Sequence, residues 1–375
     1  MTLTELVLDR GYQMLYVDQR GTGLSTTVSA ATLALQGDVK KQIDYLKLFR
    51  ADNIVRDCEA IRQALTWDYP LELKKWSVFG QSFGGFCAFT YLSKYPQGLR
   101  EVFTTGGIPP VGKTAKEVYT KTYDTLSQRN ASYYQKFPED VERVHDLVSY
   151  INSKGSIPLP SGGILTVQRF LSIGLHFGMH GGIERVHNIV LRMHSDILQF
   201  GFVTRPTLTA IGGLHSFDTA IIYAVLHESI YCQGTASAWA AESVGRGRKE
   251  YQWLSDPLSI QRDLPVFFSG EMIYRFMFDT FDELMPLRQV ADMLAQYKDW
   301  PALYDEAQLA RNEVPVYASS YIDDMYVNIN LVQETVRKTR GVKQLITNTM
   351  YHDAVRSRTE DLLKSLFALR DDVMD

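Results

Sequence analysis

The sequence predicts an α/β fold, in which a mostly parallel β-sheet is flanked by helices and interrupted by one long helical insertion. Strand-like and helix-like segments alternate over the first part of the chain, up to residue 110. One of the strands runs into a serine that stands between glycines. The alternation then stops from residue 111 to 309, where the chain is helical in tendency, and strand-like segments return after residue 309.

The first predicted strand is the apolar run at residues 12–19, which is bounded by glycines and has the pattern of a buried strand. Residues 51–65 place Ile54, Cys58 and Ile61 at helical spacing and predict a helix. The later predicted elements are strands at 75–79 and 99–107, a helix at 86–96, strands at 314–324 and 342–350, and a closing helix at 359–372. Alternating strands and helices imply a sheet covered on both faces.

These boundaries predict two domains. Residues 1–110 and 310–375 form the α/β core, and residues 111–309 form a helical cap domain that is inserted after the segment at 106–110. A chain of 375 residues is long enough to bury the cores of both.

The bulk composition excludes several classes of function. The net charge of −4 combines both signs and gives no electrostatic reason to expect nucleic acid or an anionic membrane as a partner. No apolar run approaches the ~18 residues of a membrane span, and the N-terminus lacks the pattern of a signal peptide. Three scattered cysteines predict neither a disulfide framework nor a zinc site, so a reducing cytoplasm is the expected location.

The glycine-flanked serine is the strongest single motif. Gly80-Gln81-Ser82-Phe83-Gly84 fits G-x-S-x-G, in which small residues let a strand turn sharply into a helix and expose the serine hydroxyl. The bare pentapeptide also fits an ordinary turn. A preceding strand and a following helix favour a nucleophilic Ser82.

A serine nucleophile requires a base and an acid that orients the base. In this fold the acid follows the serine in the chain, and the histidine base follows the acid. Of the eight histidines, only His352 follows the last strand-like segment. Asp323 and Asp324 both follow the preceding strand, and the pattern does not distinguish between them.

A metal site is the alternative for two other histidines. His176 and His180 stand four residues apart, as ligands on one helical face do. No acidic or cysteine partner has suitable spacing, so we expect no metal there.

These segments resemble the proline iminopeptidases (prolyl aminopeptidases), which are α/β-hydrolases that remove N-terminal proline from peptides. The matching blocks are LYVDQRGTGLS at 15–25, DNIVRDCEAIR at 52–62, GQSFGGFC at 80–87, GGIPP at 106–110, and later FFSGEMIY, YIDDMYV and MYHDAVRS. The resemblance spans nearly the whole chain and is closest to a longer, fungal-type branch. Its D-Q-R-G-x-G-x-S block is more specific than the serine motif.

The resemblance implies an α/β-hydrolase fold and a catalytic triad of Ser82, Asp324 and His352. It also implies that the backbone N–H of Phe83 contributes to an oxyanion hole. No cofactor is expected, because the triad reacts through protein groups alone. The implied partner is a peptide with an N-terminal proline, and the sequence carries no signal of oligomeric state.

In the family two glutamates of the helical cap hold the positively charged amine of the substrate. The matching residues here are Glu271 in SGEMIY and Glu228 in LHESIYC, with Glu242 as a competitor for the second position. A buried carboxylate suits this task because it disfavours any substrate without the charge.

The sequence departs from the family at its N-terminal side. The family's first strands and its G-G-P-G loop, which supplies a second oxyanion donor, have no match in this chain. The missing strand separates the 12–19 and 75–79 strands in this fold, so we expect either a gap or direct pairing of those two strands. The alternatives to an aminopeptidase are another esterase or amidase of this fold, and a fragment or catalytically impaired relative.

Overall fold

The computed structural model describes residues 2–214 and 217–372. The chain divides into two compact units. The first unit comprises Met1–Thr27, Lys47–Thr114 and Asp299–Asp375, and the second comprises Val28–Leu46 and Ala115–Lys298.

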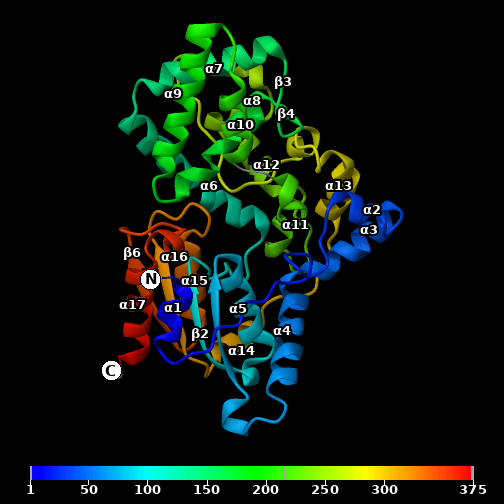
Figure 1. Cartoon of the computed structure of the whole chain (residues 1–375), viewed down its shortest axis with the longest axis vertical. Coiled ribbons are helices and arrows are strands. Elements are labelled where there is room, and N and C mark those ends of the chain that lie inside the picture. The colour runs from blue at the N-terminus through cyan, green and yellow to red at the C-terminus, as the bar shows by residue number, and fades with distance from the viewer. Residues whose placement is uncertain (1, 215–216, 373–375) are drawn as a thin grey trace. The chain divides into compact units, whose positions relative to one another are not determined.

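The first unit is built on a four-stranded parallel sheet (Figure 1). Its strands are β1 (Trp76–Gln81), β2 (Leu99–Thr105), β5 (Val316–Tyr321) and β6 (Val342–Thr347), and they lie in the order β1-β2-β5-β6. Each neighbouring pair is parallel. The predicted α/β fold with a mostly parallel sheet is therefore confirmed.

Alternate residues along the strands pack into two separate cores. On β2, Val102 belongs to one apolar cluster and Phe103 to the other. On β5, Val316 and Ala318 join the cluster of Val102, whereas Tyr317 joins that of Phe103. This period of two is the pattern of a sheet that is buried on both faces.

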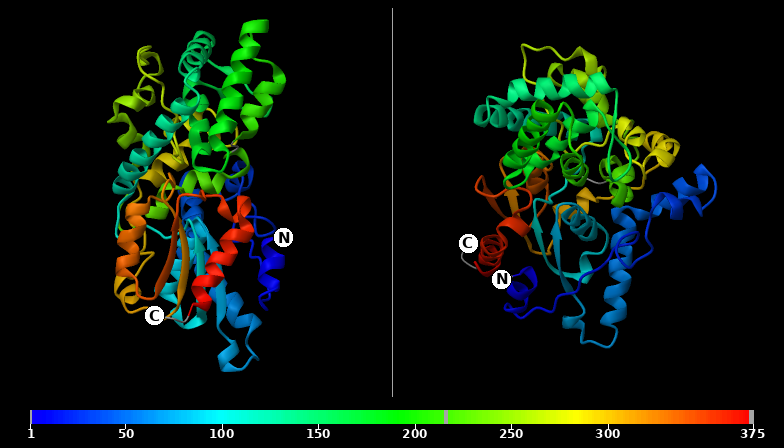
Figure 2. Two further views of the ribbon diagram at one scale, coloured as in Figure 1. Left: turned by 90° about the vertical axis from the view of Figure 1, so that its left-hand side faces the viewer. Right: turned by 45° about the horizontal axis from the view of Figure 1, so that its top comes forward.

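Helices cover both faces. The cluster around Val102 includes residues of α4 (Ala51–Leu65), α5 (Phe83–Lys94), α14 (Glu306–Ala310) and α15 (Ile329–Lys338). The cluster around Phe103 includes residues of α1 (Leu3–Leu8) and of α17 (Thr359–Asp371). In Figure 2, α17 and the N-terminal segment lie together on one side of the strands. The short α16 (Ala354–Ser357) precedes α17.

The predicted strand at 12–19 is wrong. This segment forms no strand, and the side chains of Leu15, Tyr16 and Val17 are 53%, 64% and 41% exposed. Within the described residues β1 pairs with β2 alone, so of the two expected alternatives, a gap or direct pairing of the 12–19 and 75–79 segments, direct pairing does not occur. An apolar run predicts burial, but a strand in a sheet also requires a neighbour to which its backbone groups can bond.

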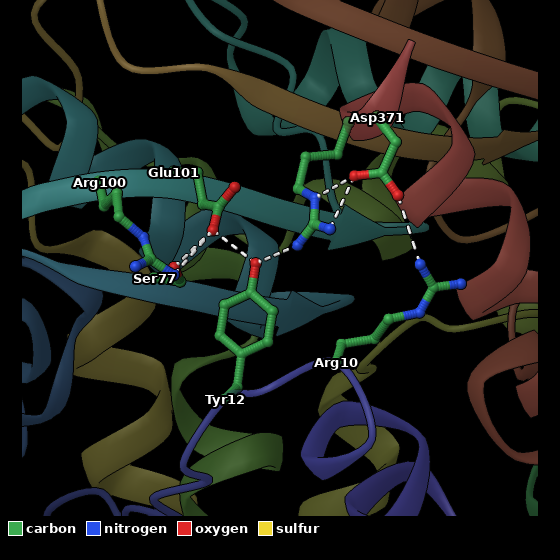
Figure 3. A network of polar contacts seen from close by, with 7 residues as sticks. Arg10, Tyr12, Ser77, Arg100, Glu101 and Asp371 are labelled. Carbon is green, nitrogen blue, oxygen red and sulfur yellow. Dashed lines mark hydrogen bonds and ion pairs between the residues drawn. The ribbon is translucent and has the colours of Figure 1, made fainter.

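The start of this segment is nevertheless held by a polar network (Figure 3). The Tyr12 hydroxyl donates a hydrogen bond to Oε1 of Glu101 on β2 at 2.7 Å. It accepts a hydrogen bond from Nη1 of Arg370 on α17, also at 2.7 Å. Ser77 of β1 donates to the same Glu101 oxygen at 2.8 Å, so one carboxylate ties the N-terminal segment to two strands.

The second unit is almost entirely helical. Its helices are α2 (Ala30–Ala34), α3 (Val39–Leu46), α6 (Ala115–Lys136), α7 (Asp140–Lys154), α8 (Val167–Leu171), α9 (Gly182–Phe200), α10 (Arg205–Leu214), α11 (Ile221–Leu226), α12 (Ala240–Arg246) and α13 (Arg288–Gln296). A small antiparallel pair, β3 (Ile157–Pro158) with β4 (Ile164–Leu165), accompanies them. None of the helices in the described ranges is long and apolar enough to cross a membrane.

The sequence-based boundaries differ from this division at residues 111–114 and 299–309, which belong to the first unit, and at one longer segment. Val28–Leu46 falls in the second unit, whereas the sequence placed it in the α/β core. Helix α3 packs on α13, and the backbone N–H of Ala30 donates to Oε2 of Glu283 at 3.0 Å. These contacts are made by residues far apart in the chain and leave no local sequence signal.

Candidate active site

Ser82 stands at the sharp turn between β1 and α5. Its backbone has φ of 54° and ψ of −121°, a conformation that costs a non-glycine residue of the order of 1–3 kcal/mol. The backbone N–H of Ser82 donates to the carbonyl of Thr105 at the end of the neighbouring strand, at 3.0 Å. The strained turn is therefore fixed to the sheet, and it presents the hydroxyl at the carboxyl end of β1.

Close packing around the turn requires glycine at two positions. A Cβ on Gly80 would lie 2.3 Å from the carbonyl oxygen of Gly84. A Cβ on Gly85 would lie 2.3 Å from the carbonyl oxygen of Gly107 and equally close to Oγ1 of Thr104. By contrast, a Cβ on Gly84 would meet nothing within 4 Å. The packing therefore requires glycine at positions 80 and 85, whereas Gly84, the last glycine of the G-x-S-x-G motif, is not required by packing.

The structure brings Ser82, His352 and Asp324 together in one hydrogen-bonded chain. Nε2 of His352 lies 2.8 Å from Oγ of Ser82, and Nδ1 of the same ring lies 2.8 Å from Oδ2 of Asp324. His352 and Asp324 are both buried, with 7% and 2% of their surface exposed. The neighbouring Asp323 is half-buried, and the carboxylate that contacts the imidazole is that of Asp324.

The second oxygen of Asp324 is also engaged. Its Oδ1 accepts hydrogen bonds from the backbone N–H groups of Tyr326 at 2.8 Å and Val327 at 2.9 Å. These bonds orient the carboxylate, so that Oδ2 points at the imidazole.

Two residues that the sequence analysis did not single out also position His352. The ring of Tyr326 packs against the imidazole with centroids 4.5 Å apart. Nε2 of Gln81 donates to the backbone carbonyl of His352 at 3.2 Å. Both residues lie within motifs already singled out, beside Ser82 and Asp324, and that adjacency is the signal that could have found them.

Phe83 is the first residue of α5. A backbone N–H in the first turn of a helix has no acceptor inside the helix. The Phe83 N–H therefore follows Ser82 directly and is available to a developing negative charge at the turn.

Glu228 lies in the second unit and is buried, with 7% of its surface exposed. Its Oε1 accepts the backbone N–H of Ala241 at 2.9 Å, and its Oε2 accepts that of Ala240 at 3.2 Å. Burial raises the pKa of Glu228 to about 7, although these hydrogen bonds and one from Ser237 oppose the shift. Glu228 therefore caps the N-terminus of α12 and carries a carboxyl group that titrates near neutrality.

Glu271 and Glu242 differ in the groups to which their carboxylates are bonded. Oε1 of Glu271 accepts a hydrogen bond from the Tyr223 hydroxyl at 2.6 Å, and its side chain is half-buried. Glu242 forms an ion pair with Arg246 and accepts the backbone N–H of Arg275 at 3.0 Å. Glu242 is thus neutralised by a cation, whereas Glu271 is bonded to an uncharged phenol.

The histidines considered as metal ligands lie elsewhere. Nε2 of His176 is 2.8 Å from the backbone carbonyl of Leu214. Within the described part of the chain, no group of three or more histidine, cysteine or acidic side chains is arranged to hold a metal ion.

Comparison with known proteins identifies the family. Residues 3–188 match the family model for the alpha/beta hydrolase fold. Proline iminopeptidase aneH of Aspergillus aculeatus is 44% identical over 98% of this chain and 80% of its own length. The chain belongs to the proline iminopeptidase family. A second member, the proline iminopeptidase of Aeromonas sobria, is 39% identical over 96% of this chain and 81% of its own length. The resemblance inferred from the motifs is therefore confirmed, and the chain is a hydrolase of the α/β-hydrolase fold.

A likeness to solved structures is weaker. An alpha/beta fold family hydrolase from Bacillus anthracis str. Sterne superposes with a TM-score of 0.38 at 13% identity, over 94% of this chain and 80% of that one.

Proposed function

We propose that the protein is a serine aminopeptidase that hydrolyses N-terminal proline from peptides through an acyl-enzyme. The observation that carries the proposal is the hydrogen-bonded chain from Asp324 through His352 to Ser82, in which both contacts measure 2.8 Å. The names of the two curated relatives support the choice of substrate.

In this mechanism Ser82 is the nucleophile and His352 is the base. Nε2 of His352 takes the hydroxyl proton while Oγ of Ser82 attacks the carbonyl carbon of the substrate's first residue. The imidazolium then donates that proton to the departing amine, which leaves a prolyl ester on Ser82. Water, deprotonated by His352 in the same way, releases proline and restores the enzyme. Asp324 keeps the Nδ1 proton in place and stabilises the imidazolium.

The negative charge that develops on the carbonyl oxygen needs a hydrogen-bond donor. The backbone N–H of Phe83 serves as that donor, because it follows the nucleophile and has no acceptor within α5.

Recognition of the free amine falls to Glu271 and Glu228 in the second unit. A charge-assisted contact in a buried site excludes substrates whose terminus is blocked. Glu271 is the stronger candidate, because Tyr223 leaves its charge uncompensated. Glu228 supplies a second carboxyl group, although each of its oxygens also accepts a backbone N–H.

The test compares three substrates: a prolyl anilide, the same anilide with an acetylated nitrogen, and a simple acyl ester. We expect turnover of the free prolyl anilide, little turnover of the blocked one, and loss of activity in Ser82→Ala. Turnover of the ester and the blocked anilide at equal or higher rates would instead identify another esterase or amidase. No turnover by the folded protein would identify a catalytically impaired relative.

A further inference from the structure

Among the buried polar atoms of the second unit that have no hydrogen-bond partner within the described residues, two belong to side chains that contact the same ring, that of Tyr231. They are the hydroxyl oxygen of Tyr119 on α6 and Nε2 of His227, which follows α11. Tyr119 is 1% exposed and His227 is 6% exposed. An unpartnered buried polar atom costs of the order of 1–3 kcal/mol, so such atoms call for an explanation.

Both atoms belong to one cluster of side chains. The ring of Tyr231 lies 5.8 Å from that of Tyr119 and 6.4 Å from that of His227, in edge-on contacts. The ring of Tyr223 lies 5.1 Å from that of His227. The Tyr223 hydroxyl in turn donates to Glu271. Aromatic rings therefore pack next to the two unpartnered atoms, and one of these rings bonds to a carboxylate.

Two carboxylates lie at this cluster, because Glu271 bonds to the Tyr223 hydroxyl and Glu228 directly follows His227 in the chain. Burial is the main cause that raises the pKa of Tyr119 well above its ordinary value, followed by the charge of Glu228 and then by the neighbouring Tyr231, Glu271 and Tyr223. The unpartnered hydroxyl thus lies within the field of both glutamates. A positively charged group is the missing component that such a site would attract.

The bonding of His227 determines which of its ring nitrogens can accept a hydrogen bond. Burial lowers the pKa of His227, and the charge of Glu271 together with a hydrogen bond to the Glu271 backbone only partly offsets this effect, so the ring is neutral near pH 7. Because Nε2 is the unpartnered nitrogen, Nδ1 carries the proton that bonds to the Glu271 backbone. Nε2 is then a lone-pair acceptor.

We propose that His227 is a specificity-determining residue, whose Nε2 accepts one N–H of the N-terminal ammonium of the substrate while the carboxylate of Glu271 accepts another. The inference rests on the proposed aminopeptidase function and deepens it. A prolyl terminus is a secondary ammonium with two N–H bonds, which matches these two acceptors. The pyrrolidinium ring suits the tyrosine faces, since aromatic rings attract organic cations.

His176 provides a matched control within the same unit. It is also buried, one of its ring nitrogens contacts a backbone carbonyl, and its Nδ1 has no partner among the described residues. Its surroundings differ, because burial lowers the pKa of His176 and the charged residue that acts on it, Arg185, lowers it further. A site beside an arginine repels an ammonium, so His176 should play no part in amine recognition.

The experiment compares His227→Phe, His227→Gln and the control His176→Gln. Phenylalanine keeps the ring but removes the acceptor, whereas glutamine retains an acceptor oxygen. We expect kcat/KM for the prolyl anilide to fall about 10- to 100-fold in His227→Phe, mainly through KM, as for a lost hydrogen bond to a charged group. We expect a smaller loss in His227→Gln and no change in His176→Gln. Labelling of Ser82 by a fluorophosphonate, which carries no ammonium, should proceed at the wild-type rate in all three.

A second measurement observes amine binding with His227 in place and uses a His227 variant only to assign one resonance. Pyrrolidine is added to ¹⁵N-histidine-labelled Ser82→Ala protein, and we expect the Nε2 resonance of one neutral histidine to move as its lone pair accepts a hydrogen bond. His227→Gln identifies that resonance by its absence. Equal kcat/KM in wild type and His227→Phe, or an unmoved His227 resonance at saturating pyrrolidine, would overturn the inference.

These outcomes are separable from failure of the proposed function. If the wild type binds pyrrolidine through His227 but does not hydrolyse the anilide, the aminopeptidase proposal fails and the amine site stands. If the wild type hydrolyses the anilide and His227→Phe does so equally well, the aminopeptidase proposal stands and the role of His227 fails.

Discussion

Oδ2 of Asp324 and Nδ1 of His352 lie 2.8 Å apart, and the other oxygen of Asp324 is held by two backbone N–H groups. The carboxylate therefore cannot rotate away from the imidazole without giving up both of those bonds. His352 is in this way held with Nε2 directed at Ser82.

The pair of adjacent aspartates allows a matched test of this relationship. Asp324→Asn should reduce kcat about 10³- to 10⁴-fold, because an amide stabilises neither the required tautomer nor the imidazolium. Asp323→Asn should leave kcat within a few-fold of wild type. Steady-state kinetics on a prolyl anilide checks both. A larger loss in Asp323→Asn than in Asp324→Asn would show that Asp323, rather than Asp324, is the acid of the triad.

The glycines after Ser82 give a second matched pair. Gly85→Ala should lower the free energy of unfolding by about 1–3 kcal/mol, because its Cβ would be forced against the carbonyl of Gly107. Gly84→Ala should be neutral or stabilising by up to ~1 kcal/mol, since its Cβ meets open space and alanine favours the helix. Urea unfolding of both variants measures the difference. Equal effects would contradict the close packing at Gly85.

The carboxyl group of Glu228 predicts a pH dependence of amine binding. Its pKa of about 7 exceeds the ordinary value of 4.5, so the folded protein favours the protonated form, and the stability this contributes is lost as the pH rises through about 7. A bound cation favours the ionised form instead. Pyrrolidine should therefore bind Ser82→Ala protein more tightly at about pH 8 than at about pH 5.5, as measured by calorimetry. In Glu228→Gln that difference should shrink, and an unchanged difference would remove Glu228 from the site.

A second buried carboxylate predicts acid sensitivity of the α/β core. Glu59 accepts hydrogen bonds from Arg62, Tyr91 and Gln63, and the bonds to Arg62 are the main cause that lowers its pKa to about 2. A lowered pKa stabilises the fold above about pH 4.5, and this stabilisation is lost as the pH falls toward 2. Its size is of the order of 2–3 kcal/mol. Glu59→Gln should reduce stability at pH 7 and flatten its dependence between about pH 4.5 and pH 2. Chemical denaturation at each pH would show parallel curves for both proteins if the network contributed nothing.

The four strands of the sheet and the serine turn could be predicted from the sequence, because both depend on local patterns. Strands β1, β2, β5 and β6 lie where apolar runs predicted them, and the serine turn has a short, specific motif. Residues 12–19 have an equally apolar pattern but form no strand, since pairing depends on a neighbour that periodicity does not reveal. The capping bonds of Glu228 and the cluster around His227 arise between distant segments and were likewise invisible to a local pattern.

The most direct test of the account is to trap the acyl-enzyme. The protein is mixed with a prolyl ester, quenched in acid while turnover continues, and digested for peptide mass spectrometry. The account predicts a prolyl group on the peptide that contains Ser82, and no such adduct in Ser82→Ala. Continued hydrolysis without an adduct on Ser82, or hydrolysis that survives Ser82→Ala, would contradict it.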